Sequence, residues 1–230
     1  MSVSPPARHV PVRPVMRRPS QLDPTVGTWA VIGAGAHGTA VAAALTAGGI
    51  PTLRYDRSTS ARSTSTPSTS AEASLGTAGD LIGHEVIAIE EIEDIEALAV
   101  TSRDVTTDEI TTEYVSGVVI CTGRYDDWPF IDPDTLNVVE GHPVLAHRMF
   151  TPRHPAIVIS GPDVTAGLQQ QADVIAAYAA TLAAEPRRAL AFHRRACARL
   201  LPGYPRVLVD PVADQDYESV LDRDLASLTT

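Results

Sequence analysis

The order of apolar and polar positions in the first third of the chain outlines a strand, a helix and a second strand. A short apolar run, Trp29–Ile32, leads into closely spaced glycines and then an alanine-rich stretch that ends at Gly48 and Gly49. A short apolar run bounded by turn residues is typical of a buried strand, and glycines commonly end helices. With a further short strand at Thr52–Tyr55, the pattern predicts a βαβ unit over residues 27–57.

Further along the chain, the pattern changes to alternating β-branched residues separated by acidic turns. The acidic stretch Glu90–Glu96 could also form a helix, given Ile89, Ile92 and Ile95, but its β-branched neighbours favour a strand. We therefore predict a β-meander with strands at His84–Ile92, Ala97–Arg103 and Glu109–Val115.

Two continuous apolar runs in the second half predict central strands that open into loops at their carboxyl ends. Val118–Cys121 is followed by Thr122 and Gly123, and Ala156–Ser160 is followed by the turn at 161–163. A helix is predicted from about Ala166 to Leu182. Such strand ends border ligand crevices in open α/β sheets, so the pattern predicts a crevice formed by these two loops and the first glycine loop.

Composition divides the chain into five parts. Arginines and prolines dominate the start, and serines and threonines dominate the stretch after Asp56, so neither segment is expected to pack into a core. We predict a disordered arm at 1–26, the βαβ unit at 27–57, a linker at 58–76, the meander with the rest of the main domain at 77–200, and a tail with a short helix at 201–230.

Charge and apolar content exclude some classes of partner. The 230 residues are 44% hydrophobic, and the net charge is −10 without a single lysine. No nucleic acid partner is expected, because a broad basic surface is missing. No membrane partner is expected either, since no apolar stretch reaches membrane-spanning length. We predict a cytoplasmic protein.

The cysteines and histidines do not form a recognisable metal or disulfide pattern. Cys121 and Cys197 are expected to be buried apolar residues, as two cysteines form neither a disulfide framework nor a metal cluster. His142, His147 and His154 lack metal-ligand spacing, which indicates loop or surface positions. No metal site is predicted.

The strongest chemical signal is the motif G-x-G-x-x-G formed by Gly33, Gly35 and Gly38. In a strand-to-helix turn, the first glycine permits the tight turn, the second lets the backbone approach a pyrophosphate, and the third allows close packing of helix on strand. The positive end of the helix dipole and its unpaired amides attract the phosphates. The motif predicts a dinucleotide site, and the alternative is a glycine-rich turn that binds nothing.

Two neighbouring residues refine this prediction. Asp56 ends the second strand roughly 20 residues beyond the glycines, where a carboxylate can accept hydrogen bonds from a ribose diol. A carboxylate there also repels a 2′-phosphate, which favours FAD or NAD over NADP, although Arg57 beside it works against that preference. His37 is a candidate cofactor contact at the start of the helix, and the alternative is a solvent-exposed spacer.

The second half of the chain resembles a known family. The segment VVICTGRYDDWPFI at 118–131, the segment VEGHPVLAHRMFTPRHPAIVISG at 139–161 and the Gln- and Ala-rich helix after it are similar to the C-terminal part of flavin-containing monooxygenases, including N-hydroxylating siderophore enzymes. Thr122 and Gly123 match the family's ATGY-type segment, and Gly161 matches the glycine at the flavin. The segment DYESVLDRDLASL at 216–228 is similar to the family's closing helix.

The departures from the family concern its second nucleotide site. This sequence has no second G-x-G-x-x-G motif, no GG-x-W loop and no F-x-G-x-x-x-H linker motif. The resemblance therefore implies an α/β, Rossmann-like FAD-binding three-layer fold with a small β-meander and with the NADPH domain absent.

The resemblance also implies where FAD would lie. The ADP pyrophosphate would contact the loop of Gly33, Gly35, His37 and Gly38, the ribose would contact Asp56, and Thr122 and Gly123 would line the crevice. The isoalloxazine end would lie near Gly161 and Asp163, with the helix from about Ala166 stabilising negative charge on a reduced flavin. No catalytic acid or base is identified.

Three functions follow from these observations. The first is an FAD-binding oxidoreductase resembling a truncated flavin-containing monooxygenase, acting on a small-molecule substrate and reduced by that substrate, by diffusing NAD(P)H or by a partner reductase. The second is a single-domain NAD(H)-dependent oxidoreductase. The third is a non-catalytic partner that completes a larger enzyme subunit, for which the arginine-rich segment Arg187–Arg199 could provide a docking face.

Overall fold

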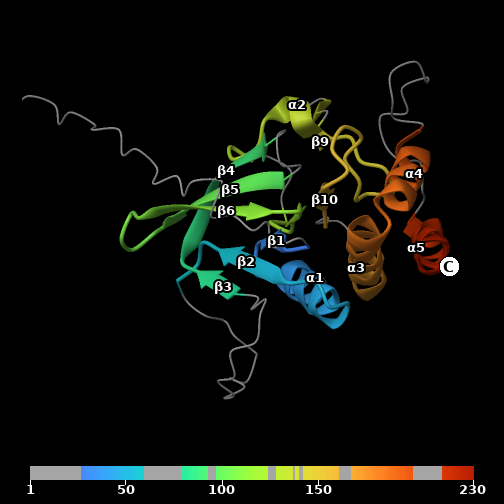
Figure 1. The fold of residues 1–230 in the computed structure, drawn as a ribbon, viewed down its shortest axis with the longest axis horizontal. Coiled ribbons are helices and arrows are strands. Elements are labelled where there is room, and N and C mark those ends of the chain that lie inside the picture. The colour runs from blue at the N-terminus through green and yellow to red at the C-terminus, as the bar shows by residue number, and fades with distance from the viewer. Residues whose placement is uncertain are drawn as a thin grey trace, which may run out of the picture.

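The computed structural model describes residues 27–59, 79–92, 97–123, 128–136, 138–139, 142–160, 167–198 and 214–230. Its centre is a parallel sheet with the strand order β10-β7-β1-β2-β3 (Figure 1). Apolar residues of β1 and β7 are almost fully buried, as expected for a parallel sheet covered on both faces. The strands are β1 (Trp29–Ile32), β2 (Thr52–Asp56), β3 (Gly79–Ile82), β7 (Gly117–Ile120) and β10 (Ile157–Ile159).

An antiparallel meander covers one face of this sheet. It consists of β4 (His84–Ile92), β5 (Ala97–Asp104) and β6 (Ile110–Val115), with β5 in the middle. Val86, Ile89 and Val100 of the meander pack in one apolar cluster with Ala30 and Ile120 of the parallel sheet. The meander is therefore one layer of a three-layer arrangement.

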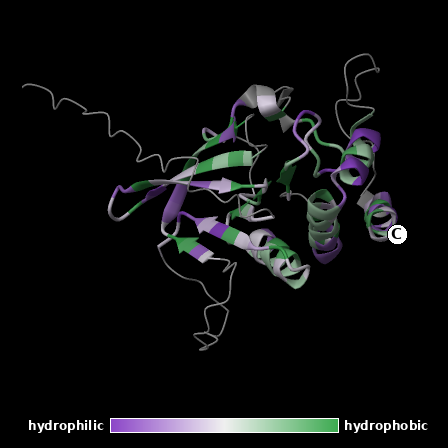
Figure 2. Cartoon of the chain, in the orientation of Figure 1, coloured by the Kyte–Doolittle hydropathy of each residue, from purple (hydrophilic) through white to green (hydrophobic). Residues whose placement is uncertain are grey.

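Helices form the layer on the other face. The first, α1 (Ala36–Ala47), packs against α3 (Leu168–Ala184), and α3 in turn packs against α4 (Pro186–Cys197) and α5 (Asp214–Thr229). Figure 2 shows hydrophobic colour on α1 and much of α3, and hydrophilic colour where β5 turns into β6 at the far end of the meander. None of the helices within the described ranges has the length and apolarity that a bilayer crossing requires.

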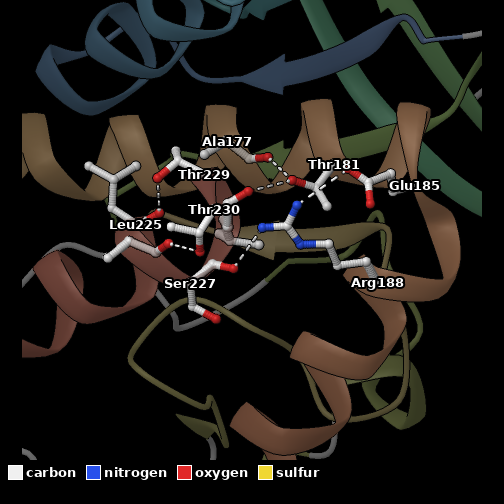
Figure 3. A network of polar contacts seen from close by, with 10 residues as sticks. Ala177, Thr181, Glu185, Arg188, Leu225, Ser227, Thr229 and Thr230 are labelled. Atoms are coloured by element: carbon white, nitrogen blue, oxygen red, sulfur yellow. Dashed lines mark hydrogen bonds and ion pairs between the residues drawn. The ribbon is translucent and has the colours of Figure 1, made fainter.

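The C-terminal helix is fixed to its neighbours by polar contacts (Figure 3). Arg188 of α4 donates to the carbonyl oxygen of Ser227 at 3.0 Å and contacts Glu185 at 3.3 Å. A cation at this end of α5 is favourable, because the last carbonyls of a helix carry partial negative charge. Thr181 of α3 donates to the carbonyl oxygen of Ala177 at 2.7 Å and lies 3.4 Å from that of Leu228. Residues of α5 therefore belong to the main core.

The predicted α/β, Rossmann-like three-layer fold with a small meander is confirmed. The strands and helices expected from the apolar runs lie within a few residues of their predicted bounds. The strand β3 was not predicted, and it extends the parallel sheet beyond β2. Three shorter elements were also not predicted, namely α2 (Pro133–Leu136), β8 (Val138–Val139) and β9 (His142–Pro143).

Both cysteines are buried free thiols, as expected. The arginine-rich segment forms α4, with Arg187, Arg194 and Arg195 exposed, whereas Arg199 lies outside the described residues. Gly161, Asp163 and Ala166 also lie outside them, so the expected flavin contacts at 161–163 stay predictions.

Candidate functional site

A cavity of about 870 Å³ opens at the carboxyl ends of β1, β2 and β7. This edge of the sheet is where open α/β proteins bind their ligands. Four segments line the cavity: the loop from β1 into α1, the end of β2, the start of β4, and the loop after β7. All the described site residues predicted from the sequence, except Gly38, are among its lining residues, namely Gly33, Gly35, His37, Asp56, Thr122 and Gly123.

The three motif glycines have different spatial roles. A Cβ atom on Gly38 would lie 1.7 Å from the carbonyl oxygen of Gly33, and one on Gly33, at φ 107°, would lie 2.7 Å from that of Cys121. These two glycines let α1 and β7 approach the loop closely. A Cβ atom on Gly35 would have no neighbour within 4 Å. Gly35 therefore leaves open space at the start of α1, where the backbone can approach a ligand.

The first turn of α1 is suited to an anion. Among the described residues, no side chain caps its amides, and the turn contains no acidic residue. Unpaired amides at a helix N-terminus carry partial positive charge and bind phosphate groups readily. The amides of Gly33 and Ala34 already donate to Tyr55 and Asp56, so it is the start of α1, from Gly35 onward, that has the properties of a phosphate cradle.

Asp56 is an ionised acceptor on the cavity wall. Its Oδ2 accepts a hydrogen bond from the Ala34 amide at 2.9 Å, and its Oδ1 accepts one from the Ser58 amide at 2.7 Å. Partial burial acts to raise the pKa of Asp56, but the hydrogen bonds from Ser58 and Ala34 and the charge of Arg54 together hold it below its ordinary value. The carboxylate is thus charged at neutral pH and keeps lone pairs for a ligand hydroxyl.

Two residues that line the cavity each have a polar atom that is buried without a hydrogen-bond partner within the described part of the chain. These atoms are the hydroxyl oxygen of Tyr55 and Nδ1 of His84. Burial, followed by the nearby charge of Glu113, raises the pKa of Tyr55, so its hydroxyl remains a donor. Buried polar groups in folded proteins are normally satisfied, which makes these two candidates for contact with a bound molecule.

The loop after β7 supplies an aromatic wall. Trp128 donates from Nε1 to Thr122 Oγ1 at 2.9 Å, and its ring stacks with that of Phe130 at a centroid distance of 6.4 Å. Gly123, which lines the cavity in the same loop, has φ 74°, a conformation that favours glycine. Flat apolar rings of this kind suit a planar aromatic ligand.

Cys121 lines the cavity with a buried thiol. Burial raises its pKa to about 12, although contact with Ser160 works in the opposite direction. A thiol with this pKa stays protonated at neutral pH, and the thiolate is the reactive form. Among the described residues, no group of three or more His, Cys, Asp or Glu side chains could hold a metal ion.

His37 is partly buried, and its role as a cofactor contact stays a prediction. It is held inward because Nδ1 lies 3.1 Å from Oγ of Ser160, the residue at the carboxyl end of β10. Burial lowers the pKa of His37, and contact with Gln171 of α3 partly opposes this. The contact with Ser160 brings the end of β10 to the start of α1, although the two residues are 123 positions apart.

Sequence reasoning missed Tyr55, His84 and Trp128 as cavity residues. Tyr55 directly precedes Asp56, and Trp128 lies within the segment that carried the family resemblance, so both had a local signal. His84 had no local signal in the sequence, because it reaches the cavity only through the pairing of β3 with β2.

Comparison with known proteins shows the fold. No protein-family model and no curated protein sequence matches the chain. Among solved structures, S-allyl-L-cysteine S-oxygenase from Allium sativum matches with a TM-score of 0.50 and 11% identity over 87% of this chain and 88% of that protein. Tmm from Pelagibacter sp. strain HTCC7211 has a TM-score of 0.45 with 8% identity over 85% and 79%.

Thioredoxin reductase from Giardia duodenalis has a TM-score of 0.36 with 15% identity, and the match covers 72% of this chain but 53% of that protein. The fold assignment rests on the first of the three matches, in which most of each chain is aligned. The chain therefore shares its Rossmann-like α/β architecture with a solved oxygenase.

Proposed function

We propose that the chain is an FAD-binding oxidoreductase that resembles a truncated flavin-containing monooxygenase and acts on a small molecule. The observation that carries this proposal is the single cavity that combines an uncapped glycine loop with an ionised acid at the next strand end. In a dinucleotide, the diphosphate and the adenosine ribose are joined, so a site for both needs these two features side by side.

The residues present fit an FAD molecule at its adenosine end. The diphosphate would be held by the amides at the start of α1, from Gly35 onward, and Asp56 would accept from ribose hydroxyls. The orphaned hydroxyl of Tyr55 and Nδ1 of His84 would find partners on the bound molecule. The aromatic wall around Trp128 would exclude water from one side of the cavity.

FAD would supply the redox chemistry by accepting and donating electrons at its ring system. The protein would bind and orient the cofactor and exclude water. We expect the flavin end to lie toward the loops that follow β7 and β10, near Thr122, Gly123, Gly161 and Asp163. The substrate would itself reduce the flavin, or diffusing NAD(P)H or a partner reductase would do so.

The resemblance to S-allyl-L-cysteine S-oxygenase supports a monooxygenase-type reaction, since that protein is an oxygenase of similar architecture. The same glycine loop and acid would also suit NAD(H). These two contacts are to the diphosphate and the ribose, which FAD and NAD(H) share, so they do not distinguish the two cofactors. A non-catalytic partner subunit would keep the cavity but lack turnover. The three alternatives therefore differ in which cofactor the purified protein binds and in whether it turns over a substrate.

The direct test is to purify the full chain, add FAD, remove the excess and record the visible absorption spectrum before and after denaturation. Retained flavin that is released on denaturation supports the proposal. A protein that retains no FAD but binds NADH saturably would establish the second function. Retained FAD without turnover with any reductant or small substrate would favour the partner subunit.

Two glycine variants make the test specific to the cradle. Gly35→Val places a side chain in open space at φ −66°, which an ordinary residue tolerates, so it should fold and fail to retain FAD. Gly79→Ala adds a methyl group with ordinary contact to Leu53, outside the cavity lining, and should retain FAD like the parent. Equal retention by both variants would contradict the proposed cradle.

A further inference from the structure

A chain of hydrogen bonds runs from the cavity to the C-terminal helix. His37 Nδ1 lies 3.1 Å from Ser160 Oγ, and Ser160 donates to Gln171 Oε1 at 2.8 Å. Gln171 Nε2 donates to the hydroxyl of Tyr217 at 2.8 Å, and Tyr217 donates to the carbonyl oxygen of His147 at 3.2 Å. Ser160, Gln171 and Tyr217 are at most 3% exposed, so the two bonds that join them are shielded from water. We name these four side chains, from His37 to Tyr217, the polar relay.

The last hydrogen bond of the polar relay, from Tyr217 to a backbone carbonyl, determines which group donates in each of the other bonds. A backbone carbonyl can only accept, so Tyr217 must donate to it and its oxygen is left to accept from Gln171. The amide of Gln171 then presents its oxygen to Ser160, which must donate. The hydroxyl of Ser160 has only one proton, and therefore Nδ1 of His37 is the donor in the remaining bond.

This order of donors and acceptors fixes the tautomer of His37. The neutral ring carries its proton on Nδ1, and Nε2 is the nitrogen that can gain a proton. His37 belongs to the first turn of α1 and lines the cavity beside Gly35 and Ala36. A proton added at Nε2 would create a cation next to the phosphate cradle.

The groups around His37 favour the neutral ring while the cavity holds no anion. Burial lowers the pKa of His37, contact with Gln171 partly opposes this, and the α1 dipole disfavours a cation at its N-terminus. The helix α1 has no other ionisable side chain. On the elements packed against α1, the ionisable groups are Arg54, Tyr55 and Asp56 on β2 and Asp173 and Tyr178 on α3; Cys121 follows β7, and Tyr217 of α5 ends the polar relay. Asp173 accepts a hydrogen bond from Gln169. Because Asp173 is two residues from Gln171, it lies on another side of α3.

A bound diphosphate would reverse this balance, because it brings two negative charges to the glycine loop. We propose that His37 takes up a proton at Nε2 when the diphosphate of a dinucleotide binds, so that this site binds its cofactor more tightly in mildly acidic solution. The inference rests on the proposed function, since it requires the diphosphate to occupy the cradle. The ring then donates from Nδ1 to Ser160 and from Nε2 to a phosphate oxygen, as a charge-assisted hydrogen bond.

The test is isothermal titration calorimetry of FAD into the full chain at pH 7, in several non-phosphate buffers that differ in ionisation enthalpy. FAD suits this test because each phosphate of its diphosphate has a single, strongly acidic hydroxyl, so its charge is constant over the pH range used. The dependence of the observed heat on buffer gives the number of protons taken up. We expect a positive number below one for the parent, and a dissociation constant that rises with pH by at most about tenfold per unit between pH 6 and 8.

The variant His37→Asn should bind FAD with no proton uptake and a pH-independent dissociation constant over this range. The matched control His154→Asn removes a histidine outside the cavity lining and should keep the uptake. Adenosine, which has no phosphate, should bind without uptake.

The outcomes separate the two proposals. Binding of FAD by the parent without proton uptake, or with an uptake that His37→Asn preserves, would overturn the role of His37 and leave the proposed function standing. Absence of FAD binding by the parent would overturn both.

Discussion

Asp56 Oδ2 accepts a hydrogen bond from the amide of Ala34 at 2.9 Å, so the acid at the end of β2 holds the glycine loop between β1 and α1. The same side chain receives the Ser58 amide and lines the cavity. One carboxylate therefore shapes the proposed phosphate cradle and offers the ribose its acceptor.

We expect Asp56→Asn to weaken FAD binding by about 10- to 100-fold, because hydrogen bonds to a charged group contribute about 1.5–3 kcal/mol. The amide keeps the size of the carboxylate but has only one acceptor oxygen for Ala34, Ser58 and the ribose. Equilibrium titration with FAD measures the change. Asp80→Asn changes an acid on β3 that pairs with Arg54 and is absent from the cavity lining, and it should bind FAD within about threefold of the parent.

Gly38→Ala should unfold the protein or destabilise it by more than about 3 kcal/mol, because overpacking against rigid backbone is severe. The added Cβ atom would lie 1.7 Å from the carbonyl oxygen of Gly33 and could be accommodated only by moving α1 from β1. Gly35→Ala is the matched variant within the same motif, and it should leave the free energy of unfolding nearly unchanged. Chemical denaturation followed by circular dichroism compares them, and similar stabilities would contradict this division of roles.

The local pattern was sufficient to predict the unit β1–α1–β2. Its strand is a continuous apolar run, its helix ends at a glycine pair, and the positions of Gly33 and Asp56 follow from spacing along one short segment. The strand β3 was missed for the opposite reason. None of its four residues, Gly79–Ile82, is fully buried and they have no apolar period of their own, so only pairing with β2 defines them as a strand.

The interior of the site could not be predicted, since its contacts join distant segments. His37 meets Ser160 across 123 positions, and Gln171 meets Tyr217 across 46. Each of these residues taken alone is a common polar side chain in a helix or at a strand end. The contacts between them form only when α3 packs between α1 and α5, and this packing cannot be deduced from a local sequence pattern.

Tyr217→Phe should destabilise the protein by about 1–3 kcal/mol, because it leaves Gln171 Nε2 and the carbonyl oxygen of His147 without their buried partner. The ring itself still fills its place in the core. Tyr114→Phe on β6, which is only partly buried, is the matched control and should change the free energy of unfolding by less than about 0.5 kcal/mol. Urea denaturation distinguishes the two, and equal effects would show that the Tyr217 hydroxyl bonds contribute little.

The buried imidazole of His193 should make the protein less stable in mild acid. Burial lowers the pKa of His193 from 6.5, and the hydrogen bond from Nε2 to the carbonyl oxygen of Thr151, at 2.8 Å, only partly opposes this. Because the unfolded chain then binds more protons than the folded one, stability rises with pH up to about 6.5 and falls as the pH drops below it.

His193→Gln should reduce this acid-side loss while leaving the slope above pH 7.5 unchanged, because glutamine offers an amide donor toward Thr151 but does not titrate. The loss between pH 7.5 and 5 should be about 1 kcal/mol smaller than in the parent. Some loss should remain, since burial also lowers the pKa values of His37 and His154. Urea denaturation at a series of pH values measures the difference. Parallel curves for the two proteins over the whole range would mean that His193 titrates alike in the folded and unfolded chains.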